Sequence, residues 1–70
     1  MKHTEVLEIF KKTLPDYAKY LKEWFPNGRN EIRVRLLDMR QFIFVYNSEE
    51  DWMFETLDRY IAQMRELFDE

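Results

Sequence analysis

Hydrophobic residues recur at intervals of three and four over residues 4 to 24, the spacing of an amphipathic helix. The stripe consists of Val6, Phe10, Leu14, Tyr17, Leu21 and Trp24. Pro15 interrupts this pattern, because proline lacks the amide hydrogen that a helix interior needs. Thr13 and Asp16 flank the proline in a way that is typical of a new helix start. We therefore expect either one kinked helix or two short helices that are divided near Thr13.

The pattern then changes to that of strands. Phe25-Pro26-Asn27-Gly28 ends the helix, and Gly28, the only glycine, is expected to have a positive φ. Residues 31 to 37 predict a half-buried strand, and residues 42 to 46 predict a second strand that is apolar on both faces. The first strand alternates apolar and charged residues, namely Ile32, Arg33, Val34, Arg35 and Leu36.

The loop between these strands decides which side chains share a face. The segment from Asp38 to Gln41 is short enough for a hairpin, but it has no glycine that would define the turn type. A loop of two or four residues would place the aromatic residues of the second strand beside the arginines. A loop of three residues would place them with the aliphatic residues, and we favour it because it buries more aromatic surface. These aromatic residues are Phe42, Phe44 and Tyr46.

A second helix is predicted after Asn47 or Ser48. Ser48-Glu49-Glu50-Asp51 has the form of a capping box, with acids in the first turn where the helix dipole favours them. The apolar stripe of this helix would consist of Met53, Leu57, Tyr60, Ile61, Met64, Leu67 and Phe68. The order helix, hairpin, helix predicts one small α+β domain over residues 1–70. Because a two-stranded sheet leaves two open edges, pairing with a second copy through the hairpin is one option.

Composition excludes several classes of protein. The chain has 70 residues and no cysteine, which excludes disulfide scaffolds, thiolate zinc sites and cysteine nucleophiles. No apolar run approaches the roughly 18 residues of a membrane span, and no signal peptide opens the chain. We therefore expect no membrane association and a cytoplasmic location.

Few residues are candidates for catalysis. His3 lies near the start of the chain, and Ser48 is explained by its capping position. Asp51, Glu55 and Asp58 would share one face of the last helix, but no second element supplies further oxygen ligands for a metal. One glycine does not make a phosphate-binding loop. The sequence therefore predicts a protein that is not an enzyme and that has no metal and no cofactor.

Nucleic-acid binding would need the arginines of the hairpin to lie beside exposed aromatic residues, as on a platform for single strands. The sequence pI of about 5.2 argues against this interpretation, because phosphate binding normally needs a basic excess. Single-stranded nucleic acid is therefore only an alternative partner. The arginines concerned are Arg29, Arg33, Arg35 and Arg40.

Charge is divided unevenly along the chain. Residues 1–46 hold nine Lys and Arg against six Asp and Glu, a net charge of +3. Residues 47–70 hold two Arg against eight Asp and Glu, a net charge of −6. An acidic last helix could dock onto a basic groove of another protein, although acids at helix termini also serve the dipole and solubility.

Three segments resemble small proteins encoded by phages and mobile elements of Gram-positive bacteria. The resemblance spans roughly residues 20–60, and only Asp38-Met39 departs from the Asp-Gly that is expected at the hairpin tip. It implies an inhibitor of a host defence protein that acts by stoichiometric binding, as anti-CRISPR proteins do. The segments are Trp24-Phe25-Pro26-Asn27-Gly28, Ile32-Arg33-Val34-Arg35-Leu36 with Phe42-Ile43-Phe44-Val45-Tyr46-Asn47-Ser48, and Asp51-Trp52-Met53-Phe54-Glu55-Thr56.

Two partner-binding surfaces follow from this hypothesis. The first is the acidic face of the last helix, which would meet a basic groove of a host protein such as a CRISPR effector; it consists of Glu49, Glu50, Asp51, Glu55 and Asp58. The second is an exposed side of the hairpin, which consists of Arg33, Arg35, Phe42 and Phe44. Two alternatives are a homodimer or other oligomer joined through the hairpin, and binding of single-stranded nucleic acid.

Overall fold

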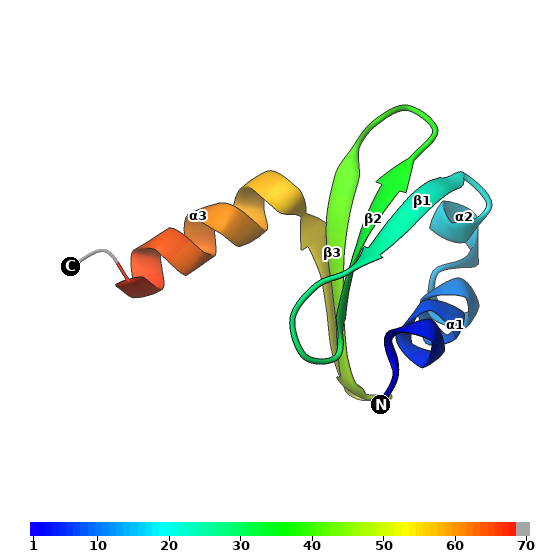
Figure 1. Ribbon diagram of the computed structural model, residues 1–70, viewed down its shortest axis with the longest axis horizontal. Helices are drawn as coiled ribbons and strands as arrows, with labels where there is room; N and C mark the ends of the chain where they lie inside the picture. The colour runs from blue at the N-terminus through cyan, green and yellow to red at the C-terminus, as the bar shows by residue number, and fades with distance from the viewer. Residues whose placement is uncertain (69–70) are drawn as a thin grey trace.

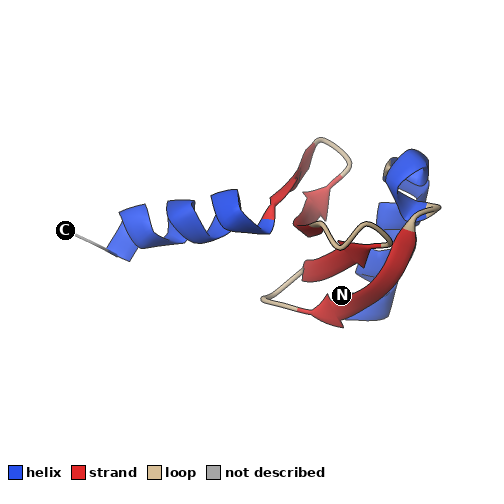
Figure 2. Ribbon diagram, turned by 90° about the horizontal axis from the view of Figure 1, so that it is seen from above, coloured by secondary structure: helices blue, strands red, loops and turns tan. Residues whose placement is uncertain are grey.

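Four strands in chain order form the centre of the molecule. The computed structural model describes residues 1–68, and its strands pair antiparallel in the order β1-β2-β3-β4 (Figure 1). The helices α1 and α2 lie against one face of the sheet, whereas α3 extends away from it (Figure 2). The elements are α1 (His3–Thr13), α2 (Pro15–Ala18), β1 (Leu21–Pro26), β2 (Glu31–Leu36), β3 (Gln41–Ser48), β4 (Asp51–Thr56) and α3 (Leu57–Phe68). The fold is α+β, as predicted, but the sheet has four strands instead of two.

The hydrophobic core lies between α1 and one face of the sheet, which we call the inner face. Val6 and Phe10 of α1 are fully buried there. The ring of Phe10 meets the ring of Phe44 edge-on, with 5.5 Å between centroids. This aromatic geometry is favourable beyond the area it buries. The core residues of the sheet are Ile32, Val34, Leu36, Phe42 and Phe44.

The first helical segment is divided rather than kinked. Leu14, with φ −128° and ψ 64°, separates α1 from α2, and Pro15 occupies the first turn of α2. Proline is well suited to that position because its missing amide hydrogen would have no partner there. Of the two alternatives that the sequence left open, the structure has the two short helices.

The prediction of a helix through Trp24 is wrong, because the chain enters β1 at Leu21. Trp24 pairs with Val34 of β2, and the amide of Leu37 donates a hydrogen bond of 2.8 Å to the carbonyl of Tyr20. Aromatic residues favour strands, and β1 satisfies the hydrogen-bonding groups along one side of β2. The spacing of Leu21 and Trp24 matches that of a helix, but both residues lie in a strand.

The helix predicted after Ser48 begins later, because residues 51–56 form β4. Phe54 pairs with Phe44, and Trp52 pairs with Tyr46, so cross-strand aromatic contacts stabilise this strand. Helix α3 begins only at Leu57, where Oγ1 of Thr56 accepts a hydrogen bond of 3.3 Å from the amide of Arg59. Within the predicted apolar stripe, Met53 belongs to β4. For Leu67 and Phe68, the structure describes the backbone but not the side chains, so their part of the predicted stripe lies outside the description.

Two hairpin loops share one geometry. Hydrogen bonds from the amide of Asn27 to the carbonyl of Glu31 and, at 2.9 Å, from the amide of Leu36 to the carbonyl of Arg40 close the two loops. Three residues lie between the residues of each closing pair, and the third is left-handed: Asn30 with φ 58° and Met39 with φ 74°. The favoured three-residue loop is therefore confirmed. Asn30 and Met39 hold the left-handed positions of these loops, which a glycine commonly occupies.

The expectation of a positive φ at Gly28 is wrong. No glycine has a positive φ, and Asn30 takes the left-handed position of that loop instead. A Cβ at Gly28 would lie 2.9 Å from Oε1 of Glu31, so the residue is small because a side chain passes close to it. Among residues 1–68, no helix is long and apolar enough to cross a membrane.

Candidate interaction surfaces

Arg33 and Arg35 lie on the opposite face of the sheet from Phe42 and Phe44. The register pairs Val34 with Phe42, which puts both aromatic residues on the inner face. Phe42 is 6% exposed and Phe44 is fully buried. The prediction that these two aromatic residues are exposed beside the arginines is therefore wrong. Phe42 and Phe44 therefore present no exposed rings on which unpaired bases could stack.

The arginines are held by partners on their own face, which we call the outer face. Arg33 donates a hydrogen bond to Oε1 of Gln41, and its guanidinium lies 4.3 Å from the ring centroid of Phe25. Arg35 forms an ion pair with Glu23 of the neighbouring strand. A guanidinium over an aromatic ring is attracted to it electrostatically. These contacts occupy both arginines in packing the outer face.

Glu55 is also part of the outer face, and the prediction that it shares a helix face with the other acids is wrong. It pairs with Ile43, which is fully buried, and its side chain is only 11% exposed. Its Oε2 lies 3.7 Å from Nε of Arg59, while its Oε1 is buried and has no hydrogen-bond partner. The alternation of side chains along β4 places this carboxylate on the outer face, where its neighbours bury it. It is therefore not available to a partner.

The remaining predicted acids separate into two places at opposite ends of β4. Glu49 and Glu50 form the turn between β3 and β4, and Asp51 begins β4; we call these three residues the acidic tip. All three are exposed. Asp58 lies beyond the other end of the strand, in α3. The ion pairs found among residues 1–68 do not include any residue of the acidic tip.

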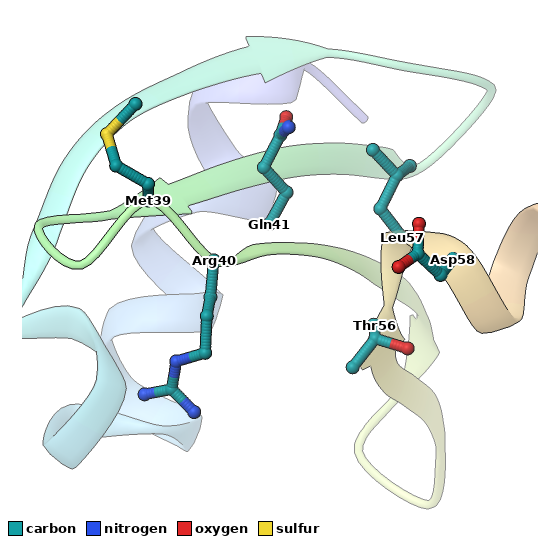
Figure 3. A pocket seen from close by; sticks show the side chains of 6 residues that line it. All are labelled: Met39, Arg40, Gln41, Thr56, Leu57 and Asp58. Atoms are coloured by element: carbon teal, nitrogen blue, oxygen red, sulfur yellow. The ribbon is translucent and has the colours of Figure 1, made fainter.

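Asp58 lines an open cleft of about 250 Å³ at the junction of β4 and α3 (Figure 3). The Arg40 side chain on the other side of this cleft is turned to Asp38, with 2.6 Å between Nε and Oδ2. The Arg40 backbone amide and guanidinium lower the pKa of Asp38 below its ordinary value of 3.8, although desolvation partly opposes them. The labelled side chains point in different directions, so the cleft gathers no converging polar groups. The other lining residues are Met39, Gln41, Thr56 and Leu57.

Helix α3 is attached to the outer face through its first turns. The hydroxyl of Tyr60 donates a hydrogen bond of 2.9 Å to Oε1 of Glu31. Burial, with the nearby Glu31 carboxylate, raises the pKa of Tyr60 above its ordinary value of 10.0. Farther along, Ile61 is 44% exposed and Met64 is 38% exposed. Ile61 and Met64 are thus left uncovered where the helix leaves the sheet.

A groove of about 330 Å³ lies beside α1 on the inner face. Its apolar lining comes from Ile9, Tyr46 and Trp52, and Trp52 is 39% exposed. Lys12, Thr13 and Glu49 complete it. Nothing in the sequence around Trp52 indicated a groove, because α1 and β4 are far apart in the chain.

Residues with catalytic potential do not converge in the described part of the chain. The Nε2 atom of His3 lies 3.1 Å from the carbonyl of Gly28, and Ser48 ends β3 at the acidic tip. Among residues 1–68, no group of three or more His, Asp or Glu residues has the arrangement of a metal site. Comparisons of the chain with protein-family models, curated proteins and solved structures found no match.

Proposed function

We propose that this protein is a non-catalytic binding module with which a phage or mobile element inhibits a host defence protein, such as a CRISPR effector, in the bacterial cytoplasm. The observation that carries this proposal is the acidic tip. Its three carboxylates are consecutive, exposed and outside every ion pair described for residues 1–68. The resemblance to phage and mobile-element proteins supplies the class of target.

Three like charges on one tight turn repel each other in the free protein. A basic groove on a target relieves this repulsion, and the field of the tip speeds encounter with such a groove. Charges of this kind mainly raise the association rate, and packed side chains around them supply most of the affinity. The target that we propose therefore has a positively charged groove wide enough for a hairpin turn.

The other arrangements considered receive less support. Binding of single-stranded nucleic acid would need exposed aromatic residues beside unpaired arginines, but Phe42 and Phe44 are buried and Arg35 is paired with Glu23. A homodimer joined along the edges of the predicted hairpin would need free edges on β2 and β3. Both strands lie inside the sheet, whose edges are β1 and β4.

The first experiment is a pull-down of the tagged protein from a bacterial host lysate, with and without nuclease, read by mass spectrometry. The proposal expects one stoichiometric protein partner that survives nuclease treatment. A partner that disappears with nuclease would point to nucleic acid, and recovery of the protein alone would remove the support for a host target.

Charge reversal then tests the acidic tip. The double variant Glu50→Lys with Asp51→Lys should lower the association rate with the captured partner by roughly tenfold or more at low salt. The matched control is Glu8→Lys with Asp16→Lys, which makes the same change of charge at exposed positions of α1 and α2. If both double variants slow association equally, only the net charge matters and the tip is not the contact surface.

A further inference from the structure

Asn27 and Gly28 are the one Asn-Gly pair in the chain. They lie in the loop between β1 and β2, and both are exposed. The backbone nitrogen of the residue that follows an asparagine attacks the side-chain amide, and asparagine is thermolabile for this reason. The attack is fastest before glycine, because no Cβ hinders the nitrogen. The loop therefore holds the most reactive asparagine sequence on an open surface.

The hydrogen bonds of this loop leave the attacking nitrogen free. The amide of Asn27 donates a hydrogen bond of 3.0 Å to the carbonyl of Glu31. The carbonyl of Gly28 accepts one of 3.1 Å from the amide of Glu31, and Nε2 of His3 lies 3.1 Å from the same carbonyl. Within residues 1–68, the amide of Gly28 donates no hydrogen bond. Its nitrogen therefore has no contact of its own to break before it attacks the Asn27 side chain.

The side chain of Asn27 belongs to the cluster that attaches α3 to the sheet. Its Nδ2 donates a hydrogen bond of 2.9 Å to Oε1 of Glu31, and the same oxygen accepts the hydroxyl of Tyr60 at 2.9 Å. Burial and the Glu31 carboxylate raise the pKa of Tyr60, whereas the Asn27 side chain lowers it. An amide suits this position because it donates to a carboxylate, which a second carboxylate does not do.

We propose that Asn27 is a deamidation site, and that its conversion to aspartate or isoaspartate releases α3 from the outer face. The Gly28 nitrogen forms a bond to Cγ of Asn27 and the Cγ–Nδ2 bond breaks. The amide group leaves as ammonia together with the proton of the Gly28 nitrogen, and a cyclic imide remains. Water then opens the imide: cleavage at Cγ gives aspartate, and cleavage at the backbone carbonyl carbon gives isoaspartate.

Both products disturb the attachment of α3. Aspartate puts a carboxylate where the Asn27 amide donated to Glu31, so two like charges meet and one donor is lost. Isoaspartate carries the backbone through Cβ and Cγ, so the closing bond between the Asn27 amide and the Glu31 carbonyl no longer fits. Either change displaces the Glu31 carboxylate that accepts the Tyr60 hydroxyl. This inference does not depend on the proposed function, because it uses the β1–β2 loop and not the acidic tip.

The other two asparagines of the chain provide an internal comparison. Asn30 precedes Glu31, and Asn47 precedes Ser48. Both following residues carry a Cβ, which hinders attack by their backbone nitrogens. The amide of Glu31 is also engaged with the carbonyl of Gly28. The reaction is therefore expected at Asn27 before either of the other sites.

Peptide mapping by mass spectrometry tests the site. The folded protein is incubated for several days at mildly alkaline pH. The Asn27 peptide should exchange its NH2 group for OH roughly tenfold or more faster than the peptides of Asn30 and Asn47. Asn27→Gln is the control, because it keeps a side-chain amide but closes an imide ring much more slowly. Gly28→Ala is unsuitable, because its Cβ would lie 2.9 Å from Oε1 of Glu31.

Hydrogen exchange tests the release of α3. The amide hydrogens of residues 57–68 should exchange roughly two- to tenfold faster in the deamidated protein and in Asn27→Asp than in the fresh wild type. Tyr60→Phe removes the same attachment without changing the loop and should give a similar increase. Amide hydrogens of β2 and β3 should keep their rates, which establishes that the body of each variant is folded.

Three results would overturn the inference. The first is an Asn27 that stays intact in the folded protein while it deamidates in urea, which would mean that the loop protects it. The second is unchanged exchange in α3 after deamidation and in Asn27→Asp. The third is exchange that accelerates equally in α3 and in the central strands, because the modification would then weaken the whole fold instead of releasing the helix.

Discussion

The hydroxyl of Tyr60 donates a hydrogen bond of 2.9 Å to Oε1 of Glu31, and this contact fastens α3 to the outer face of the sheet. Glu31 also accepts a hydrogen bond of 2.9 Å from the side-chain amide of Asn27, so one carboxylate joins the β1–β2 loop to the last helix. Gly28 leaves room for this carboxylate because it has no side chain. The orientation of α3 thus depends on a residue that is distant in the sequence.

Replacing Tyr60 by Phe should lower the free energy of unfolding by about 0.5–1.5 kcal/mol, because the carboxylate of Glu31 loses one donor. The raised pKa of Tyr60 adds a pH dependence. The protonated phenol is favoured in the folded state, so its contribution is present below about pH 10. It is lost as the pH rises through the folded-state pKa.

Chemical denaturation of wild type and Tyr60→Phe between pH 7 and pH 11 measures both effects. The difference in stability between the two proteins should shrink as Tyr60 ionises at alkaline pH. Tyr20→Phe is the control, because Tyr20 is 51% exposed and its hydroxyl makes no hydrogen bond within residues 1–68. A constant difference across this range would show that the Tyr60 hydroxyl does not titrate in contact with Glu31.

Thr56→Ala should destabilise α3, because Oγ1 of Thr56 accepts a hydrogen bond from the amide of Arg59 in the first turn of the helix. The expected loss is about 1 kcal/mol, with a decrease in helical circular dichroism. Ser48→Ala is the matched control, because Ser48 ends β3 and caps no helix. If Ser48→Ala lowers the helical circular dichroism more than Thr56→Ala does, the helix does not begin at the boundary between β4 and α3.

Met39→Gly should raise the free energy of unfolding by about 0.5–1 kcal/mol. Met39 has a φ of 74°, which strains any residue with a Cβ, and glycine removes that strain. The gain is limited because glycine also increases the entropy of the unfolded chain. The control is Leu37→Gly in the same loop. Leu37 does not have a positive φ, so glycine relieves no backbone strain there. This variant should be neutral or destabilising in the same thermal unfolding measurement.

Glu55→Met should leave stability unchanged or raise it by roughly 1 kcal/mol, because it replaces a buried carboxylate that has one oxygen without a partner. Arg59 is largely exposed and loses little when this pair is broken. Glu50→Met at the acidic tip is the comparison and should change stability by less than about 0.5 kcal/mol. A large loss with Glu55→Met would show that its carboxylate has a structural partner.

Sequence patterns predicted the parts of this fold whose signals are local. Pro15 marked the end of α1, and the alternation around Val34 marked β2. The preference for burying Phe42 and Phe44 led to the correct hairpin register. Each of these inferences depends on neighbouring residues and on one physical rule, so no knowledge of distant contacts was needed.

The two missed strands depend on pairing partners that a local pattern does not reveal. Residues 21–26 and 51–56 contain Trp24, Phe54 and other aromatic residues that suit a helix stripe or a strand equally. Their pairing with β2 and β3 decides the outcome. The same error displaced the candidate site, because a helix would have placed Glu55 beside Asp51. The strand instead separates them along its length, with Asp51 at its exposed start and Glu55 near its other end, beside the buried Ile43.

The strict order of the sheet has a consequence for how the chain folds. Each strand pairs only with the strand before or after it, so every hairpin closes over a short loop and the contacts between strands are local. Such topologies are associated with rapid folding. Helix α1 is synthesised first, but its buried face packs against residues between Ile32 and Phe44. It can therefore dock only after the hairpin of β2 and β3 has formed. We therefore expect β2 and β3 to form the folding nucleus, with α1 docking on it and the outer strands joining last.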